Sequence, residues 1–423
     1  MGTFEFRTDS KLHKTEFYAL LAAIFFLPLL EAPKNICLLA FLVCWIINRA
    51  RAKDFGGKIS IIDITTLLLV SSGYITAFFT ELQGKEWSGP NNLLLIGLVL
   101  ILIYRSSYSS SQLRAIVITV IISTVIATLE GYYQLYTATE CAPCKIELHS
   151  VGHVNHSAIY ILLAFGASFS YMLSFWKQSS IKFKTTIILT TIFFAVTCLM
   201  TESRAAAGGV FIVATVLTLA FIPANKKLAL IIISVIVIAI GLSITARPIS
   251  VDRLINTPHK NEMSPREKIR NSSLIAWKKH PAFGIGMKNY SLVTLDKVKE
   301  WSQELGIQYV AKHHLYHHHA HNLYLNTAVE KGTLGLITLV TFLLTIMLAI
   351  IKSFPGSKGL AEDWLFWGAA SSAFITTTAI GLVNTTLHHE HGLLTVILFA
   401  CLLCSKKGSL TSTKTSKLDS NYA

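Results

Sequence analysis

Long apolar stretches alternate with short polar ones along almost the whole chain. A helix needs about 20 apolar residues to cross the hydrocarbon of a bilayer. The sequence holds twelve apolar runs of 13 to 22 residues, at 16–31, 34–48, 59–79, 92–104, 115–136, 157–176, 185–201, 205–223, 228–246, 333–351, 365–384 and 392–404. The pattern predicts an all-α, polytopic membrane protein with about twelve transmembrane helices.

Composition supports a membrane protein. Of 423 residues, 52% are hydrophobic and only 14% are charged, and the mean hydropathy is +0.54. A soluble protein of this size could not bury so much apolar surface, so a bilayer must be its solvent.

The net charge of +14 is explained by the distribution of the basic residues and not by a nucleic-acid partner, which we do not expect. With the N-terminus inside, alternate connections and both tails carry twenty Lys/Arg, whereas the short connections on the other side carry only Lys34, Lys85, Lys145 and Arg204. The positive-inside rule therefore predicts that both termini are cytoplasmic.

One long polar segment interrupts the hydrophobic runs between the ninth and tenth. We expect transmembrane helices 1–9 in residues 1–246, a periplasmic helical loop domain in 247–320, helices 10–12 in 321–404 and a cytoplasmic tail in 405–423. The loop carries twelve Lys/Arg on the side that usually lacks them, which suggests a function, although a long domain can be translocated regardless of its charge.

The loop holds a helix-start signal at Ser264-Pro265-Arg266-Glu267, and Pro281 ends the predicted helix. Arg266, Arg270, Ser273 and Trp277 are spaced to share one face. Arg266 would lie in the first turn, where free N–H groups and the helix dipole favour an anion, and its guanidinium can bind phosphate in a bidentate manner. A second helix is predicted from Ser291 to Leu305, before Gly306.

Arg204 is a second candidate cation, at the outside end of the seventh run in Thr201-Glu202-Ser203-Arg204. It is either an arginine that snorkels to the membrane surface, paired with Glu202, or a phosphate clamp at that surface.

Six histidines lie within residues 313–321. They could bind a metal, but no carboxylate or thiolate lies among them, and solvated polar positions are the plainer interpretation. His321 stands apart because it opens the segment that leads into the tenth run. A neutral imidazole there could take a proton from a sugar hydroxyl.

Two further polar clusters are predicted on the same side of the membrane, at 150–157 and at 388–391. Each alone could be a solvated turn, but together with the arginines and the histidines they suggest one shared outward site. Cys141 and Cys144 share an outside loop and could form a disulfide there.

These motifs resemble the O-antigen ligase and polymerase superfamily of bacterial envelope glycosyltransferases. His321-Asn322 followed after nine residues by Gly332-x-x-Gly335 matches the ligase signature, and Thr201-x-Ser203-Arg204 is similar to the Thr-x-Ser-Arg element of that superfamily. Arg266, fifteen residues before Pro281-x-x-Gly284-x-Gly286, resembles its loop arginine, and the stretch 152–156 resembles its glycine-to-asparagine motif. The family's tryptophan four residues after the loop arginine is Arg270 here, and Trp277 is its possible replacement.

The resemblance implies a ligase that moves a glycan from undecaprenyl diphosphate to lipid A-core at the periplasmic face of the bacterial inner membrane. Arg204 and Arg266 would hold the diphosphate and His321 would act as base. The reaction is expected to be inverting and to need no metal or cofactor. We expect further substrate contacts from Arg270, Asn155, His156, His319, Asn322 and Trp277, and the oligomeric state stays open.

Two alternatives remain at this point. An O-antigen polymerase or a protein O-oligosaccharyltransferase would use the same donor and the same motifs. A twelve-helix transporter would need charged or broken helices at the bilayer midplane, whereas the runs are almost free of charge at their centres.

Overall fold

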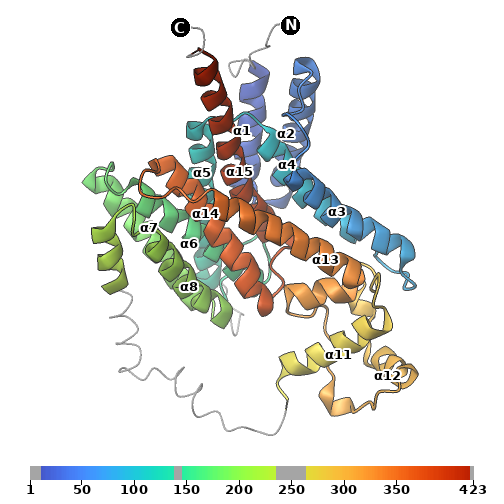
Figure 1. The fold of residues 1–423 in the computed structure, drawn as a ribbon. Coiled ribbons are helices and arrows are strands. Elements are labelled where there is room, and N and C mark those ends of the chain that lie inside the picture. The colour runs from blue at the N-terminus through green and yellow to red at the C-terminus, as the bar shows by residue number, and fades with distance from the viewer. Residues whose placement is uncertain (1–10, 138–144, 235–262, 420–423) are drawn as a thin grey trace.

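The computed structural model describes residues 11–137, 145–234 and 263–419, and every regular element in these ranges is helical (Figure 1). The α-helices are α1 (Lys11–Phe26), α2 (Glu31–Ala52), α3 (Ile61–Phe79), α4 (Gly89–Arg105), α5 (Ser110–Thr137), α6 (Val154–Phe175), α7 (Ile181–Met200), α8 (Arg204–Ala220), α11 (Pro265–Lys279), α12 (Leu295–Glu304), α13 (Leu323–Lys352), α14 (Ala361–Ala379) and α15 (His389–Asp419). The 3-10 helices are η1 (Tyr290–Leu292), η2 (Ala311–His313) and η3 (Ile380–Leu382). The predicted all-α fold class is confirmed.

Eight described helices are long and apolar enough to cross a bilayer, namely α2, α3, α5, α6, α7, α13, α14 and α15. Helices α4 and α8 are apolar but shorter, and α1 has 16 residues. Helices overlap eleven of the twelve predicted runs. Most of the ninth run, 228–246, lies outside the described residues, although a helix has begun over 226–234. The protein is a polytopic membrane protein, and the count of twelve spans stays a prediction.

Helix α6 lies at the centre of the helical body, and nearly all of its side chains are buried. It packs against α5, α7, α8, α14 and α15. Its approach to α14 is very close, because a Cβ on Gly166 would lie only 2.4 Å from the Cβ of Ser372. Small residues at such crossings let two helix backbones pack tightly where lipid supplies no hydrophobic drive. The polar segment at the start of α6 is therefore held in a fixed place.

The start of α1 and the end of α15 lie at one end of the molecule, and α11 and α12 lie at the other (Figure 1). We call these the terminal end and the cap end. Ion pairs lie at the terminal end, where the Arg105 guanidinium binds the Asp63 carboxylate at 2.8 Å and Lys406 Nζ binds the Asp363 carboxylate at 2.7 Å. The polar groups with possible chemistry gather at the cap end, as described below.

Helices α11 and α12, with the segments beside them, enclose a second, small hydrophobic core. Helix α11 begins where the sequence predicts: the Ser264 hydroxyl accepts a hydrogen bond from the Glu267 N–H, and the Glu267 carboxylate accepts one from the Ser264 N–H at 2.7 Å. The second helix is shorter than the predicted 291–305, because η1 ends at Leu292 and Thr294 caps the start of α12. Gly306 follows α12 with φ 67°. The cap is helical as predicted, with one break.

Candidate functional site

Helix α13 opens at Gly332, and the cap is attached to the opened turn. Gly332 has φ 63° and ψ −166°, which is not helical, so the neighbouring backbone groups are available to another segment. Four backbone hydrogen bonds of 2.7–3.2 Å use them: Ile285 N–H to Val329 O, Gly286 N–H to Glu330 O, Thr333 N–H to Pro281 O and Leu334 N–H to Ala282 O. We call this pairing of 281–286 with 329–334 the clasp.

Glycine is required on both sides of the clasp. A Cβ on Gly332 would lie 2.2 Å from the Ala282 carbonyl oxygen, and one on Gly284 would lie 2.5 Å from the Val329 carbonyl oxygen. Both glycines also have positive φ, 63° and 68°, where other residues are strained. The two glycine motifs that are far apart in the sequence thus meet in space and hold the cap on α13.

The histidine-rich segment 313–321 runs between α11 and α13 and is bound by both. The Asn271 side chain on α11 donates to the His313 carbonyl at 3.1 Å. At the other end, the Ala320 N–H donates to the Asn326 side-chain oxygen on α13 at 3.0 Å. These contacts fix the path of the segment relative to the clasp.

His321 lies in a strained position directly before α13. The Asn322 side chain accepts a hydrogen bond from the Leu325 N–H at 2.8 Å and caps the helix, and its amide donates to the Leu382 carbonyl at 2.7 Å. His321 has φ 48°, in the left-handed region that costs a non-glycine residue on the order of 1 kcal/mol. Such strain persists only where the surroundings hold it, and it is enriched at functional sites.

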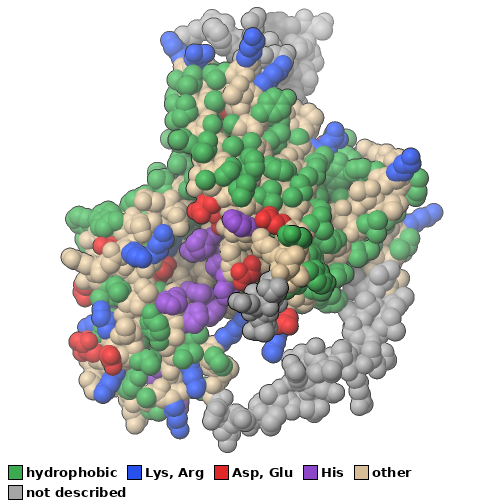
Figure 2. Space-filling view, turned by 180° about the vertical axis from the view of Figure 1, so that it is seen from behind, with side chains coloured by type: hydrophobic (Ala, Val, Ile, Leu, Met, Phe, Trp, Pro, Cys, Tyr) green, Lys and Arg blue, Asp and Glu red, His purple; other side chains and the backbone are tan. Residues whose placement is uncertain are grey.

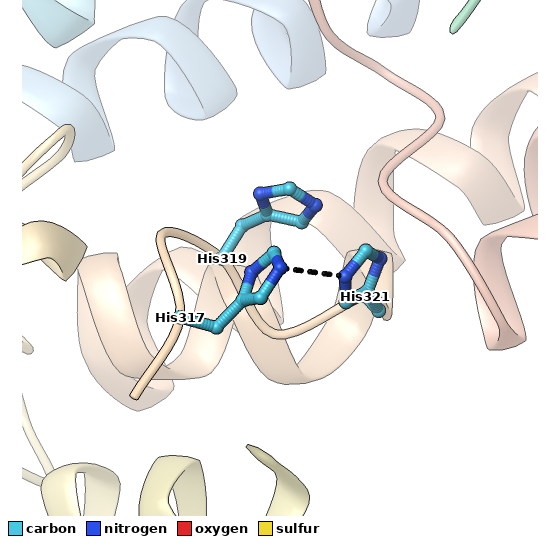
Figure 3. A group of neighbouring side chains, drawn as sticks. All are labelled: His317, His319 and His321. Carbon is cyan, nitrogen blue, oxygen red and sulfur yellow. Dashed lines mark hydrogen bonds between the residues drawn. The ribbon is translucent and has the colours of Figure 1, made fainter. Parts of the chain in front are cut away.

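Three imidazoles of this segment point toward one another, as Figure 3 shows. The Nε2 atoms of His317 and His321 are 3.3 Å apart. The ring of His319 lies 4.2 Å from that of His321 and 4.7 Å from that of His317, measured between centroids. All three side chains are half-buried, and we call them the histidine triad.

The two other polar clusters reach the same place. The rings of His153 and His156, at the start of α6, are 5.8 Å apart. The His156 ring lies 5.5 Å from His389 and 5.1 Å from His391, at the start of α15. His156 also interacts electrostatically with His321. Figure 2 shows the histidine side chains gathered in one patch, with carboxylates beside them.

Burial and mutual repulsion keep the triad uncharged. Burial, followed by the neighbouring imidazoles of His317 and His156, lowers the pKa of His319 to about 4. The pKa of His321 falls to about 3, through burial, the other two triad imidazoles and the Arg266 guanidinium. Arg266 therefore lies within electrostatic reach of His321. The site combines the positive charge of this guanidinium with uncharged imidazole rings.

The residues predicted on α11 do not all face the site. Arg266 and Arg270 are exposed on its first two turns. Ser273 is buried and shares a 2.5 Å hydrogen bond with the Tyr290 hydroxyl. Trp277 packs against the small core of the cap. The helix passes from solvent onto that core, so the predicted common face divides into a polar first half and a packed second half.

Arg204 lies at the cap end but is separate from the histidines among the described contacts. It is the first residue of α8, exposed, after the N-cap Ser203. The Cys198 thiol at the end of α7 lies 4.0 Å from the Ala158 carbonyl oxygen, so this turn is beside the start of α6. The predicted partner Glu202 instead binds Lys145 at 3.3 Å. Within the described residues the Arg204 guanidinium forms no ion pair.

Asn155 lies half-buried in the first turn of α6, beside His156. Its backbone N–H donates to Nδ1 of His153, which caps the helix. Of the predicted site residues, the structure thus brings Asn155, His156, His319, His321 and Arg266 to one region. Cys141 and Cys144 lie outside the described residues.

Sequence reasoning did not select several histidines that the structure adds to the site, namely His153, His317, His388, His389 and His391. All five lie in the predicted polar clusters 150–157, 313–321 and 388–391. Nothing local to the run 388–391 indicates its neighbours. It is anchored by a buried ion pair between Glu390 and Lys34 at the start of α2, with 2.5 Å between the carboxylate and Nζ. The two partners are 356 positions apart in the sequence, so only the tertiary structure makes that pair.

The fold and the site define a polytopic membrane protein whose histidine side chains meet at the cap end, with Arg266 within electrostatic reach of them. Residues 189–340 match the family model described as O-antigen ligase. The matched region extends from α7 through the cap to the first half of α13, and the match supports the O-antigen ligase superfamily. No curated protein matches the chain.

Proposed function

We propose that the protein is an O-antigen ligase, which transfers a glycan from undecaprenyl diphosphate to lipid A-core. The family match indicates a ligase- or polymerase-type function. The observation that supports a more specific mechanism is the electrostatic effect of Arg266 on His321, because it indicates that a cation lies within reach of a proton acceptor.

In this mechanism the arginines stabilise the leaving group. Breaking the bond between the sugar C1 and the donor oxygen leaves negative charge on a diphosphate. Arg266 and Arg204 each lie in the first turn of a helix, α11 and α8, where free N–H groups and the helix dipole also attract an anion. Stabilisation that grows as the charge develops lowers the barrier, and one such donor is typically worth about 3 kcal/mol, roughly a hundredfold in rate.

His321 accepts the proton of the acceptor hydroxyl as that oxygen bonds to C1. With a pKa of about 3, its imidazole is a weak base in the substrate-free protein. A bound diphosphate raises the pKa, because negative charge favours the imidazolium and offsets the repulsion from Arg266. The base is thus strengthened when the donor is in place, which couples proton transfer to donor binding.

We further propose the orientation of the site. The basic residues concentrate in the tails and connections assigned to the inside, so the termini would lie in the cytoplasm and the cap in the periplasm. The protein would then reside in the bacterial inner membrane, with both lipid-linked substrates entering from the outer leaflet. Arg270, Asn155, Asn322 and His319 would contact the sugars or the diphosphate, and Trp277 would support the cap.

The test is transfer by purified protein from a lipid-diphosphate glycan to lipid A-core, with a chelator present, followed by mass analysis. Arg266→Ala and His321→Ala should each slow transfer roughly a hundredfold. Lys278→Ala, an exposed cation on the same helix, and His318→Ala, an exposed neighbour of the triad, are the matched controls. Unchanged rates in the first two variants would remove the assigned roles, and glycan polymerisation with untouched lipid A-core would reassign the protein to a polymerase.

A further inference from the structure

The histidine triad has the composition and the spacing of a metal-binding site. One nitrogen of each ring can be chosen so that the three atoms all lie within 4.8 Å of one another. The Nε2 atoms of His317 and His321 are already 3.3 Å apart. In a tetrahedral zinc site with Zn–N bonds of about 2.0–2.1 Å, two nitrogens lie about 3.3–3.4 Å apart. One edge of such a site is therefore present.

The backbone is shaped to produce this convergence. In an extended chain, residues four apart would be separated by about 13 Å. His317 and His321 nevertheless have ring centroids 4.4 Å apart. The left-handed φ of 48° at His321, held by the Asn322 cap, accompanies this return of the chain. His318, which interrupts the triad, is exposed and serves as an internal reference.

The polar atoms of the triad are not satisfied by the protein. Nδ1 of His317 and Nδ1 of His321 are buried and have no hydrogen-bond partner among the described residues. The Nε2 atoms of these two rings contact each other. A cation bound by one nitrogen of each ring would fix the tautomer of all three rings.

We propose that His317, His319 and His321 bind one divalent transition-metal ion, with zinc as the best match, and leave its fourth coordination position open. Imidazole ligands favour zinc, copper, nickel and cobalt, and three protein ligands with one open position are typical of accessible zinc sites. The open position would take water or an oxygen of a bound substrate.

The site acts as an inhibitory switch, a consequence that rests on the proposed function. The lone pair that His321 needs as a base is the same lone pair that holds the metal, so one imidazole cannot serve both. The metal is therefore not part of the transfer reaction, and zinc occupancy should stop it.

Metal binding is tested without substrates. Purified, chelator-stripped protein in detergent is titrated with Co²⁺, whose absorption spectrum reports coordination number and ligand type, and then with Zn²⁺ in competition. One equivalent of Co²⁺ should give a four-coordinate spectrum that Zn²⁺ abolishes. His317→Ala and His319→Ala should each weaken binding at least tenfold, and His318→Ala should leave it unchanged. Equal losses in all three variants, or no four-coordinate spectrum, would overturn the site.

Inhibition is tested in the transfer assay. Zinc should abolish transfer by the wild type, chelator should restore it, and His317→Ala should need at least tenfold more zinc for the same inhibition. Full activity at a zinc concentration that saturates the triad would refute the switch. Because the cobalt titration contains no glycan, its result stands even if the protein proves to have another activity.

Discussion

Replacement of Gly332 by alanine should detach the cap from α13. The added Cβ would lie 2.2 Å from the Ala282 carbonyl oxygen and 2.5 Å from the Phe283 nitrogen. Ordinary contact requires more than 1 Å of displacement, which stretches the clasp hydrogen bonds beyond bonding distance.

The cost follows from the lost contacts. Four backbone hydrogen bonds at about 1 kcal/mol each, with about 1 kcal/mol for an alanine at φ 63°, give about 5 kcal/mol for the local opening. A glycine in open space separates the two terms. Gly306 has φ 67° and no atom within 4 Å of an added Cβ, so Gly306→Ala carries only the conformational cost of about 1 kcal/mol.

Amide hydrogen exchange measures the opening directly. In Gly332→Ala the amides of Ile285, Gly286 and Leu334 should exchange roughly several thousandfold faster, whereas Gly306→Ala should leave them unchanged. Transfer activity should fall with the protection, because the cap carries Arg266 and holds the histidine segment. Native protection at these amides in Gly332→Ala would refute the account of the clasp.

Three more predictions concern the supports of the site. Glu390→Leu should lower the free energy of unfolding by about 3–5 kcal/mol because it leaves Lys34 buried and unpaired. In a detergent unfolding assay, the double variant with Lys34→Met should recover most of this loss. Burial lowers the pKa of His280, although the Glu81 carboxylate opposes this, so the folded protein binds the proton less readily than the unfolded chain does. The free energy of unfolding is therefore at its full value above pH 6.5 and declines as the pH falls below it. His280→Gln should therefore flatten the acid side of the stability profile, and an unchanged profile would contradict this. Asn326→Leu removes the acceptor for the Ala320 N–H and should loosen the histidine segment. The rate of transfer should therefore fall, and zinc binding should weaken in parallel. A loss of transfer with intact zinc binding would show that the segment is held by other contacts.

Much of the fold follows from local patterns. Apolar runs of membrane-spanning length predict the helices, because a backbone in lipid must satisfy its hydrogen bonds within each segment. The Ser264–Glu267 capping box predicts the start of α11 for an equally local reason, since both partners lie within four residues. The extent of α13 was not predictable in this way, because the apolar run 333–351 does not include the helical turns before Gly332. These turns begin after the N-cap Asn322 and are joined to the cap by the clasp.

The candidate site divides along the same line. His321, His319 and Arg266 carry signals in the sequence because each lies in a short motif or beside a helix start. No signal in the sequence indicates that these residues lie close together. Their proximity depends on the clasp, on contacts from α11 to the histidine segment, and on the packing of α6 against its neighbours.

The sequence by itself determined that the chain spans a membrane and which residue types are available for chemistry, since hydrophobic length and residue identity are properties of the chain alone. Only the tertiary structure decided which of those residues meet. Histidines from α6, α15 and the segment before α13 lie between about 70 and 230 positions apart, and helix packing and the paired glycine backbones bring them together. The same packing left Trp277 against the core of the cap and gave Glu202 a different partner from Arg204.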